Sequence, residues 1–290
     1  MPEYVIFTDA TVDLTDAFVQ REKIEILPME YAMDGVMHTY CRDWTDAQYT
    51  EFYNQLRAGK VATTSQITPF VYASAFEPVL QTGRDVLYIC FSSGLSGTIE
   101  SARLVAADLM EKYPGRKVIC VDSLGATFGE GLAVITAAQK RAEGADIDAC
   151  AQWVEDNLQH NCHWFTVDDL MFLKRGGRIS ATTAIVGSAL QIKPVMHMDS
   201  EGHLIPVEKV RGRKLSLKGI ANRMKETAIR PEEQEVYIGH GDSREDAEAL
   251  ASRIREIMPV KDIYIAPLSP IIGSHSGPGT IALFFLGTQR

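Results

Sequence analysis

The sequence predicts an α/β protein of two domains, the first with a mostly parallel sheet and the second with a mixed sheet. Short apolar runs typical of buried strands alternate with longer amphipathic stretches typical of helices. The chain has 290 residues, which is enough for two separate cores. A turn signal at 199–202 joins two strand-like runs, which favours antiparallel pairing in the second half. We therefore predict domains at 1–160 and 161–290 that pack closely, with the ligand between them.

The first half of the chain alternates strands with helices. Parallel strands need a long crossover between them, usually a helix, so this order favours a parallel sheet. The run at 86–91 is apolar throughout, as expected of a strand covered on both faces. Strands are predicted at 4–9, 25–33, 86–91 and 117–121, and helices at 45–59, 69–80, 96–113, 125–142 and 146–159, with a short helical stretch from Asp13.

The second half combines a hairpin with strand–helix alternation, and this combination predicts a mixed sheet. Its helix at 180–190 is almost uncharged along its length. Strands are predicted at 164–167, 192–198, 204–210, 235–240, 262–267 and 280–286, and helices at 169–173, 180–190, 214–228 and 243–257.

Charge and cysteine content narrow the function classes. With 29 basic and 38 acidic residues the net charge is -9, and an acidic surface repels phosphate backbones, so no nucleic-acid partner is expected. No run approaches the ~18 apolar residues of a membrane helix and no targeting segment is visible, so we expect no stable membrane insertion. Five cysteines without a CxxC pair fit a reduced, cytoplasmic location. We expect neither a metal nor a cofactor.

Residues 92–98 form the richest cluster of hydroxyl side chains. The cluster follows the carboxyl end of a buried strand and opens a long helix, where ligands of parallel sheets bind. The N–H groups and dipole of the helix favour an anion there, and Gly97 allows it to approach the backbone. Ser96 and Thr98 add hydroxyl donors. The alternative is a plain helix N-cap, since serine and threonine are preferred there.

Two further segments carry candidate site residues. Thr64 and Ser65 precede the predicted helix at 69–80, so they suit either an anion site or a cap. His275 lies among the three glycines of 272–279, which suggests a backbone held in unusual conformations that aim this side chain.

These side chains suit two kinds of site. A serine, a histidine and either Asp9 or Asp122 would form a nucleophilic triad, as in a serine hydrolase acting on acyl esters. However, the sequence has no G-x-S-x-G elbow to present such a nucleophile. Neutral hydroxyls with a histidine suit instead a site that binds a carboxylate and supplies no strong nucleophile.

Two basic segments stand out in this acidic chain. The loop 174–178 ends at Arg178, and the run 209–214 contains Arg211. Such runs are usually solvated faces, but two of them in one domain also suit contact with a partner or a phosphate.

Several motifs occur in order along essentially the whole chain. They are residues 8–14 (TDATVDL), 64–66 (TSQ), 92–98 (SSGLSGT), 173–180 (LKRGGRIS), 192–194 (IKP) and 272–279 (IGSHSGPG). Together they resemble the DegV family of bacterial fatty-acid-binding proteins. Two positions depart from the family pattern: Ala10, where serine is usual, and Ile67, where proline is common. Neither departure removes an expected ligand of the head group.

The resemblance implies a non-enzymatic carrier that holds one long-chain fatty acid, for example palmitate, in a buried tunnel. The fatty-acid-binding residues would be Thr64, Ser65, Ser96, Gly97, Thr98 and His275, with Thr64, Ser96 and His275 on the carboxylate. Arg178 and Arg211 would contact a fatty-acid kinase, or the phosphate, when the acid is presented for acyl-phosphate formation. The apolar part of the predicted helix, 181–190, is a candidate wall of the tunnel, and the alternative is an ordinary core helix. We expect a cytoplasmic monomer.

Overall fold

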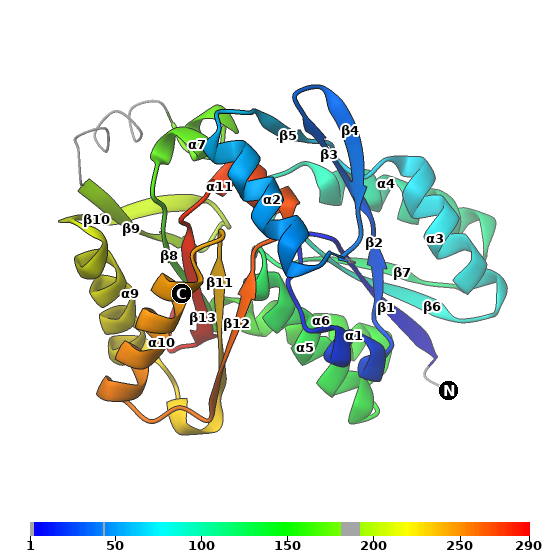
Figure 1. Ribbon diagram of the computed structural model, residues 1–290. Coiled ribbons are helices and arrows are strands. Elements are labelled where there is room, and N and C mark those ends of the chain that lie inside the picture. Colours follow the sequence, from blue (N-terminus) through cyan, green and yellow to red (C-terminus); the bar gives the residue numbers. More distant parts are fainter. Residues whose placement is uncertain (1–2, 43, 181–191) are drawn as a thin grey trace.

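The computed structural model describes residues 3–42, 44–180 and 192–290 (Figure 1). The strands are β1 (Tyr4–Asp9), β2 (Glu25–Leu27), β3 (Met29–Met33), β4 (Val36–Tyr40), β5 (Ala62–Thr64), β6 (Asp85–Cys90), β7 (Val118–Asp122), β8 (Asn161–Thr166), β9 (Ile192–Met198), β10 (Leu204–Arg211), β11 (Glu235–His240), β12 (Asp262–Pro267) and β13 (Ile281–Leu286). The helices are α1 (Asp16–Glu22), α2 (Asp46–Arg57), α3 (Pro69–Gln81), α4 (Thr98–Lys112), α5 (Phe128–Ala142), α6 (Ile147–Asn157), α7 (Leu170–Arg175), α9 (Arg213–Thr227), α10 (Arg244–Ile257) and α11 (Pro270–Ser276), with 3-10 turns η1 (Leu158–His160) and η2 (Pro231–Glu233). The predicted mixed α/β class is confirmed.

A four-stranded parallel sheet in the order β2-β1-β6-β7 forms the centre of the first half. All residues of β1 are buried, because side chains of a strand alternate between two covered faces. Val5 and Phe7 join a core with α3 and α4, while Tyr4 and Ile6 join a core with α5 and α6. The prediction of a parallel sheet covered on both faces is therefore confirmed.

A small antiparallel sheet in the order β4-β3-β5 was absent from the sequence prediction. The predicted strand at 25–33 is in fact two strands, β2 and β3, which belong to different sheets and are separated by Pro28. Most of β4 is exposed and β5 has only three residues, so neither carries the apolar alternation that reveals a half-buried strand. This small sheet positions a candidate site residue, because β5 ends at Thr64.

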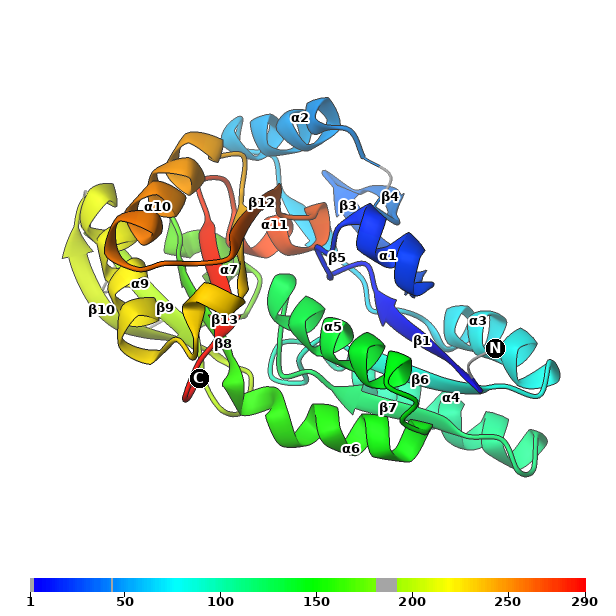
Figure 2. The ribbon, with the colours of Figure 1, turned by 90° about the horizontal axis from the view of Figure 1, so that it is seen from below.

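A six-stranded mixed sheet in the order β10-β9-β8-β13-β11-β12 forms the second half. Only β11 and β12 pair in parallel within it, and β9 and β10 form the predicted antiparallel pair. Helices α9 and α10 cover one face with an apolar core. The other face turns towards α5, which also packs on β1 and β6, so α5 lies between the two sheets (Figure 2).

The short helix α11 crosses from the second half to the first. The sequence prediction missed it, because seven residues that include Pro270 and Gly273 show no helical periodicity. It packs on α7 and also on β5, β3 and α2 of the first half (Figure 1). The domain boundary at residue 160 therefore stays a prediction, since α5 and α11 each pack on both halves.

Three further details concern predicted elements. The helix predicted from 125 begins at Phe128, and the strand predicted at 164–167 spans Asn161–Thr166. The helix predicted at 180–190 lies outside the described residues beyond Ser180. Within the parts of the chain that the structure describes, no helix has the length and apolarity that crossing a bilayer requires.

A hydrogen bond accepted by Asp13 links the start of α11 to the loop after β1. The Asp13 Oδ1 accepts the backbone N–H of Ser269, the N-cap residue of α11, at 3.3 Å, whereas its Oδ2 is buried and has no hydrogen-bond partner within 3–42, 44–180 and 192–290. Burial raises the pKa of this carboxyl to about 8, and Arg42 opposes the shift. The Asp13 carboxyl is therefore mainly protonated, and so uncharged, at pH 7.

We predict that Asp13→Asn stabilises the protein more at high pH than at low pH. The folded pKa lies above the unfolded value of ~3.9, so ionisation of Asp13 disfavours the folded state increasingly as pH rises from ~4 to about 8. Asparagine keeps the acceptor for Ser269 and cannot ionise. Urea unfolding at pH 5 and pH 8.5 should show the larger gain at pH 8.5, and the exposed Asp108→Asn should show no such trend. Equal gains at both pH values would contradict the assignment.

Candidate functional site

One cavity lies between the parallel sheet and the mixed sheet. The space between its wall atoms amounts to about 920 Å³, which includes the part open to solvent; a water-sized sphere can be centred in about 120 Å³ of it. Most of its wall is apolar. The apolar lining comprises Met29, Phe91, Leu95, Ala126, Trp164, Phe165, Leu173, Met198, Leu204, Leu268, Ile271, Ile272, Ala282 and Phe284, and the polar lining comprises Thr11, Thr64, Ser65, Gln66, Ser96, Thr127, His163, Arg178, His275, Ser276 and Thr280.

The side chains of Thr64 and His275 meet in the wall of this cavity. Thr64 Oγ1 lies 2.7 Å from His275 Nε2, across 211 residues of sequence. Burial lowers the pKa of His275 to about 4, and the charge of Arg178 adds to the shift. The imidazole is therefore neutral at neutral pH, so it contributes a hydrogen bond and no charge.

Contacts between neighbouring segments make one end of the cavity polar. A Cβ on Gly176 would lie 2.2 Å from His275 Nδ1, so the bare backbone of this glycine packs directly on the imidazole. Arg178 follows two residues later, and its Nε donates to the carbonyl of Leu95 at 3.1 Å. Leu95 precedes Ser96 in the chain. We call Thr64, Ser65, Ser96, Arg178 and His275 the polar end of the cavity.

The helix after residues 92–98 starts two residues later than predicted. Gly97, not Ser96, is the N-cap of α4, and it makes no side-chain capping bond. The Oγ of Ser96 lies 2.8 Å from Thr98 Oγ1 and accepts the Thr98 N–H at 3.3 Å. Ser96 is therefore not the N-cap residue itself, although its hydroxyl does accept an N–H at the start of the helix. The capping alternative is wrong for Thr64 and Ser65, because Thr68 caps α3.

Gly97 and Thr98 lie behind the polar end. Thr98 is fully buried, and its hydroxyl meets that of Ser96. A Cβ on Gly97 would lie 3.0 Å from the amide nitrogen of Gln66, so the missing side chain lets the 64–66 segment approach the 92–98 loop. Gly97 and Thr98 therefore pack behind the cavity wall. They are not among the described residues that line it.

The two aspartates considered for a triad bind backbone N–H groups where the chain enters the 92–98 loop, at Phe91 and Ser93. Asp9 Oδ2 accepts the N–H of Phe91 at 3.2 Å, and Asp122 Oδ1 accepts the N–H of Ser93 at 3.2 Å. From the other sheet, the carbonyl of Gly202 accepts the Ser92 hydroxyl at 2.9 Å. Both halves of the protein therefore hold the loop that carries Ser96.

Sequence reasoning missed the buried carboxyl of Glu130, which pairs with Asp9. Thr11 Oγ1 lies 2.5 Å from Asp9 Oδ1 and 2.5 Å from Glu130 Oε2, and Thr8 donates to Glu130 Oε1 at 2.6 Å. One hydroxyl proton cannot serve two carboxylates, so one of the two acids is protonated. Burial and the nearby charge of Asp9 raise the pKa of Glu130 well above its usual range, which makes Glu130 the neutral partner.

The two arginines differ in their surroundings. Arg178 is half-buried, and burial lowers its pKa; it also bonds the carbonyl of Gly176. Arg211 is exposed at the end of β10 and does not belong to the described cavity wall. The structure therefore brings Arg178 to the polar end and leaves Arg211 on the surface.

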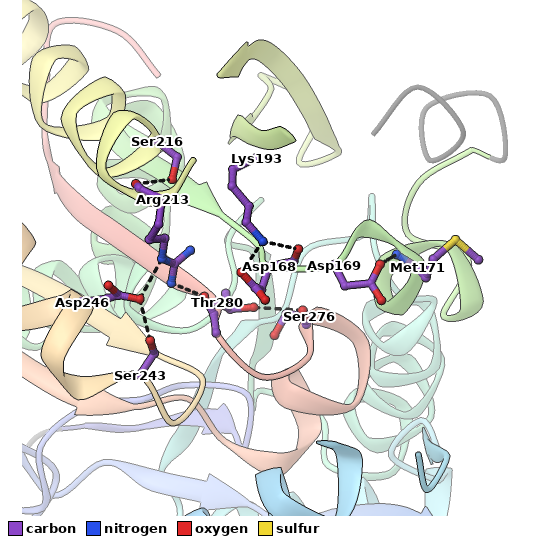
Figure 3. Close-up of polar contacts among 11 residues, drawn as sticks. Asp168, Asp169, Met171, Lys193, Arg213, Ser216, Ser243, Asp246, Ser276 and Thr280 are labelled. Atoms are coloured by element: carbon purple, nitrogen blue, oxygen red, sulfur yellow. Dashed lines mark hydrogen bonds and ion pairs between the residues drawn. The ribbon is translucent and has the colours of Figure 1, made fainter. Parts of the chain in front are cut away.

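The loop after α11 is fixed by the polar contacts in Figure 3. Arg213 binds Asp246 at 2.8 Å through its Nε and bonds the carbonyl of Gly279 through Nη2. Thr280 Oγ1 donates towards the carbonyls of Ser276 and Gly277, each at 2.9 Å. Gly277 and Gly279 have a φ of 77°, so the expected unusual backbone follows His275, which itself lies in the helix.

We predict that His275 stays neutral in solution down to a pH near 4. Its ring resonances, followed by NMR from pH 3.5 to 8, should titrate well below the ordinary histidine value. Gly176→Ala should push the ring towards solvent and raise this pKa, whereas the exposed Ser65→Ala should leave it unchanged. A wild-type titration near pH 6.5 would show that the ring is not buried as described.

Comparisons with known proteins show what this chain is similar to. A family model described as "Uncharacterised protein, DegV family" matches residues 3–288. A DegV domain-containing protein of Clostridium perfringens is 44% identical over 292 residues, which cover 100% of this chain and 99% of the relative. The solved structure titled for the fatty acid binding of a DegV family protein from Thermus thermophilus has a TM-score of 0.87 and 29% identity, covering 98% of this chain and 99% of that one. A DegV lipid binding protein from Thermotoga maritima has a TM-score of 0.84 and 26% identity, covering 99% of each chain.

Proposed function

The chain belongs to the DegV family, and on that premise we propose that it binds a single long-chain fatty acid, such as palmitate. The observation that carries the proposal is one mostly apolar cavity with a polar end, where Thr64, Ser96 and His275 lie on one continuous wall. Solved relatives described as fatty-acid-binding or lipid-binding proteins support it. The carboxylate would lie at the polar end and the acyl chain along the apolar wall.

The polar end offers hydrogen-bond donors to a carboxylate. If His275 donates its Nε2 proton to Thr64, the Thr64 hydroxyl proton is free for the ligand. The Ser96 hydroxyl can donate in the same way while it accepts the N–H of Thr98. Arg178 lines the same end and supplies the positive charge that a buried carboxylate needs.

Burial of the tail would supply most of the binding free energy. At ~0.8 kcal/mol per methylene, a sixteen-carbon chain gains on the order of 12 kcal/mol by leaving water. The hydrogen bonds at the head group would add less, and they would orient the acid in the cavity.

The alternative function, a serine hydrolase acting on acyl esters, has less support. The Ser96 hydroxyl is bonded to Thr98, while His275 is bonded to Thr64. Asp9 and Asp122 already accept the backbone N–H groups of Phe91 and Ser93. We therefore propose a carrier rather than an enzyme, and we assign no catalytic residue.

We further propose that the protein presents its ligand to a fatty-acid kinase, which converts the carboxylate to an acyl phosphate. The exposed Arg211 suits contact with the kinase, and Arg178, at the polar end, suits contact with the carboxylate or the arriving phosphate. A cytoplasmic location and a monomeric state remain part of this proposal.

We expect Ser96→Ala and Thr64→Val each to weaken binding of palmitate roughly ten- to a hundredfold. A hydrogen bond to a charged group contributes roughly 1.5–3 kcal/mol, and ~1.4 kcal/mol is a factor of ten. The double variant should lose less than the sum, because both hydroxyls contact one group. Isothermal titration calorimetry compares the palmitate affinity of the wild type with those of the two single variants and the double variant.

Ser101→Ala on α4 is the matched control, since this serine is outside the cavity wall. Ser96→Ala should also lower stability by about 1 kcal/mol, because it removes the hydroxyl that accepts the Thr98 N–H at the start of α4. Unchanged affinity in both single variants would refute the head-group assignment. Ester hydrolysis that Ser96→Ala abolishes would instead favour the hydrolase.

We expect substitutions of Arg178 and Arg211 to have different effects in a kinase assay. Arg211→Ala should leave palmitate affinity unchanged and slow acyl-phosphate formation by a purified fatty-acid kinase with ATP. Arg178→Ala should lower both, because Arg178 also holds Leu95 and Gly176 at the polar end. Arg230→Ala, an exposed arginine paired with Glu233, should affect neither. A normal rate for Arg211→Ala would remove Arg211 from the kinase contact.

A further inference from the structure

Two buried polar groups in the cavity wall play no part in the proposed head-group site. Thr127 is 4% exposed and His163 is 2% exposed, and both line the cavity. Among the residues that the structure describes, the Oγ1 of Thr127 and the Nε2 of His163 have no hydrogen-bond partner, as is also true of the Oγ of Ser276, the neighbour of His275 in the chain. Buried polar atoms in folded proteins are nearly always bonded, so two such atoms on one cavity wall point to a partner supplied by a ligand.

Thr127 occupies the N-cap position of the fifteen-residue helix α5 but does not make the usual capping hydrogen bond, in which a threonine hydroxyl accepts a backbone N–H. Its φ of 54° and ψ of -130° are rare for a β-branched residue. The hydroxyl therefore remains available beside the first turn of α5, where unpaired N–H groups also favour an oxygen atom.

His163 reaches the same turn of α5 from strand β8. A Cβ on Gly129 would lie 2.2 Å from His163 Nε2, so the ring packs on the bare backbone two residues after Thr127. Its Nδ1 lies 3.1 Å from the sulfur of Met198. Burial lowers the pKa of His163 well below its usual range, so the ring is neutral and offers a donor at one nitrogen and an acceptor at the other.

The surroundings of these two groups differ from the polar end. Phe165, Met198 and Phe284 of the mixed sheet line the cavity around His163, whereas Thr64 and His275 come from β5 and α11. Apart from the two unpaired groups, a plain hydrocarbon chain would fit this apolar stretch. A plain hydrocarbon chain would leave Thr127 and His163 without hydrogen-bond partners, or it would leave water beside them.

We propose that Thr127 and His163 form a second polar subsite, which binds a hydroxyl group carried on the acyl chain. The ligand class of the site would then include hydroxy fatty acids, whose chain oxygen pairs with the Thr127 hydroxyl and the His163 ring. This inference rests on the proposed binding of a fatty acid, and it adds a preference among acids that share the same carboxylate.

The test compares stearate with a panel of hydroxystearates in which the hydroxyl steps along the chain. Competition binding gives the affinity of each acid for the wild type, for Thr127→Val and for Thr166→Val. Valine keeps the branched shape and removes only the hydroxyl. Thr166 is the matched control, because it is also buried, its hydroxyl also has no partner among the described residues, and it does not belong to the described cavity wall.

We expect one position of the hydroxyl to bind the wild type best relative to stearate. Thr127→Val should reduce that preference, taken as the affinity ratio to stearate for the same variant, by about tenfold, the usual effect of one lost hydrogen bond. Thr166→Val should keep the preference, and Thr127→Ser should retain most of it. Retention of the full preference by Thr127→Val would overturn the subsite.

Two further outcomes are decisive. If the wild type binds stearate and no hydroxystearate is preferred, the inference is wrong while the proposed function stands; this holds even if Thr127→Val does not fold. If the wild type binds neither acid, the proposed function fails, and the subsite fails with it.

Discussion

The buried carboxylate of Asp9 is the interaction on which the rest of the site depends. It is fully buried and accepts the N–H groups of Thr11 and Phe91 and the hydroxyls of Thr11 and Tyr88. Burial raises its pKa, and these four hydrogen bonds oppose the rise. Through them the end of β1 holds the start of the 92–98 loop. The neutral carboxyl of Glu130 extends the network to α5, so one group of polar atoms ties together β1, β6 and the helix between the sheets.

The site combines neutral groups with one arginine, and both halves of the chain hold it. His275 is neutral because it is buried, and it reaches Thr64 because α11 packs against β5 of the other half. Gly202 of the β9–β10 connection holds the same loop that Asp9 holds. A carboxylate bound here would depend on hydroxyls, a neutral imidazole and the half-buried Arg178. This arrangement suits tight, reversible binding of an acid better than attack on an ester.

Local patterns in the sequence predicted the larger elements well and the smaller ones poorly. The strand at 86–91 and the helix at 69–80 match β6 and α3 closely, because continuous apolar runs and a proline at the first turn act locally. The strands β4 and β5 and the helix α11 were missed. They are short, exposed or rich in glycine and proline, and they form because the surrounding structure supports them.

The sequence by itself determined the α/β class, the hydroxyl clusters around Thr64 and Ser96, and the glycine-rich setting of His275. Each of these has a signal within a few neighbouring residues. Only the tertiary structure decided that Thr64 bonds His275 and that Glu130 shares Thr11 with Asp9. It also decided that Gly97 rather than Ser96 occupies the N-cap position of α4, and that the Thr127 hydroxyl has no partner in the described part of the chain. Contacts between residues more than a hundred positions apart depend on how the two sheets pack around α5, and no local pattern records that packing.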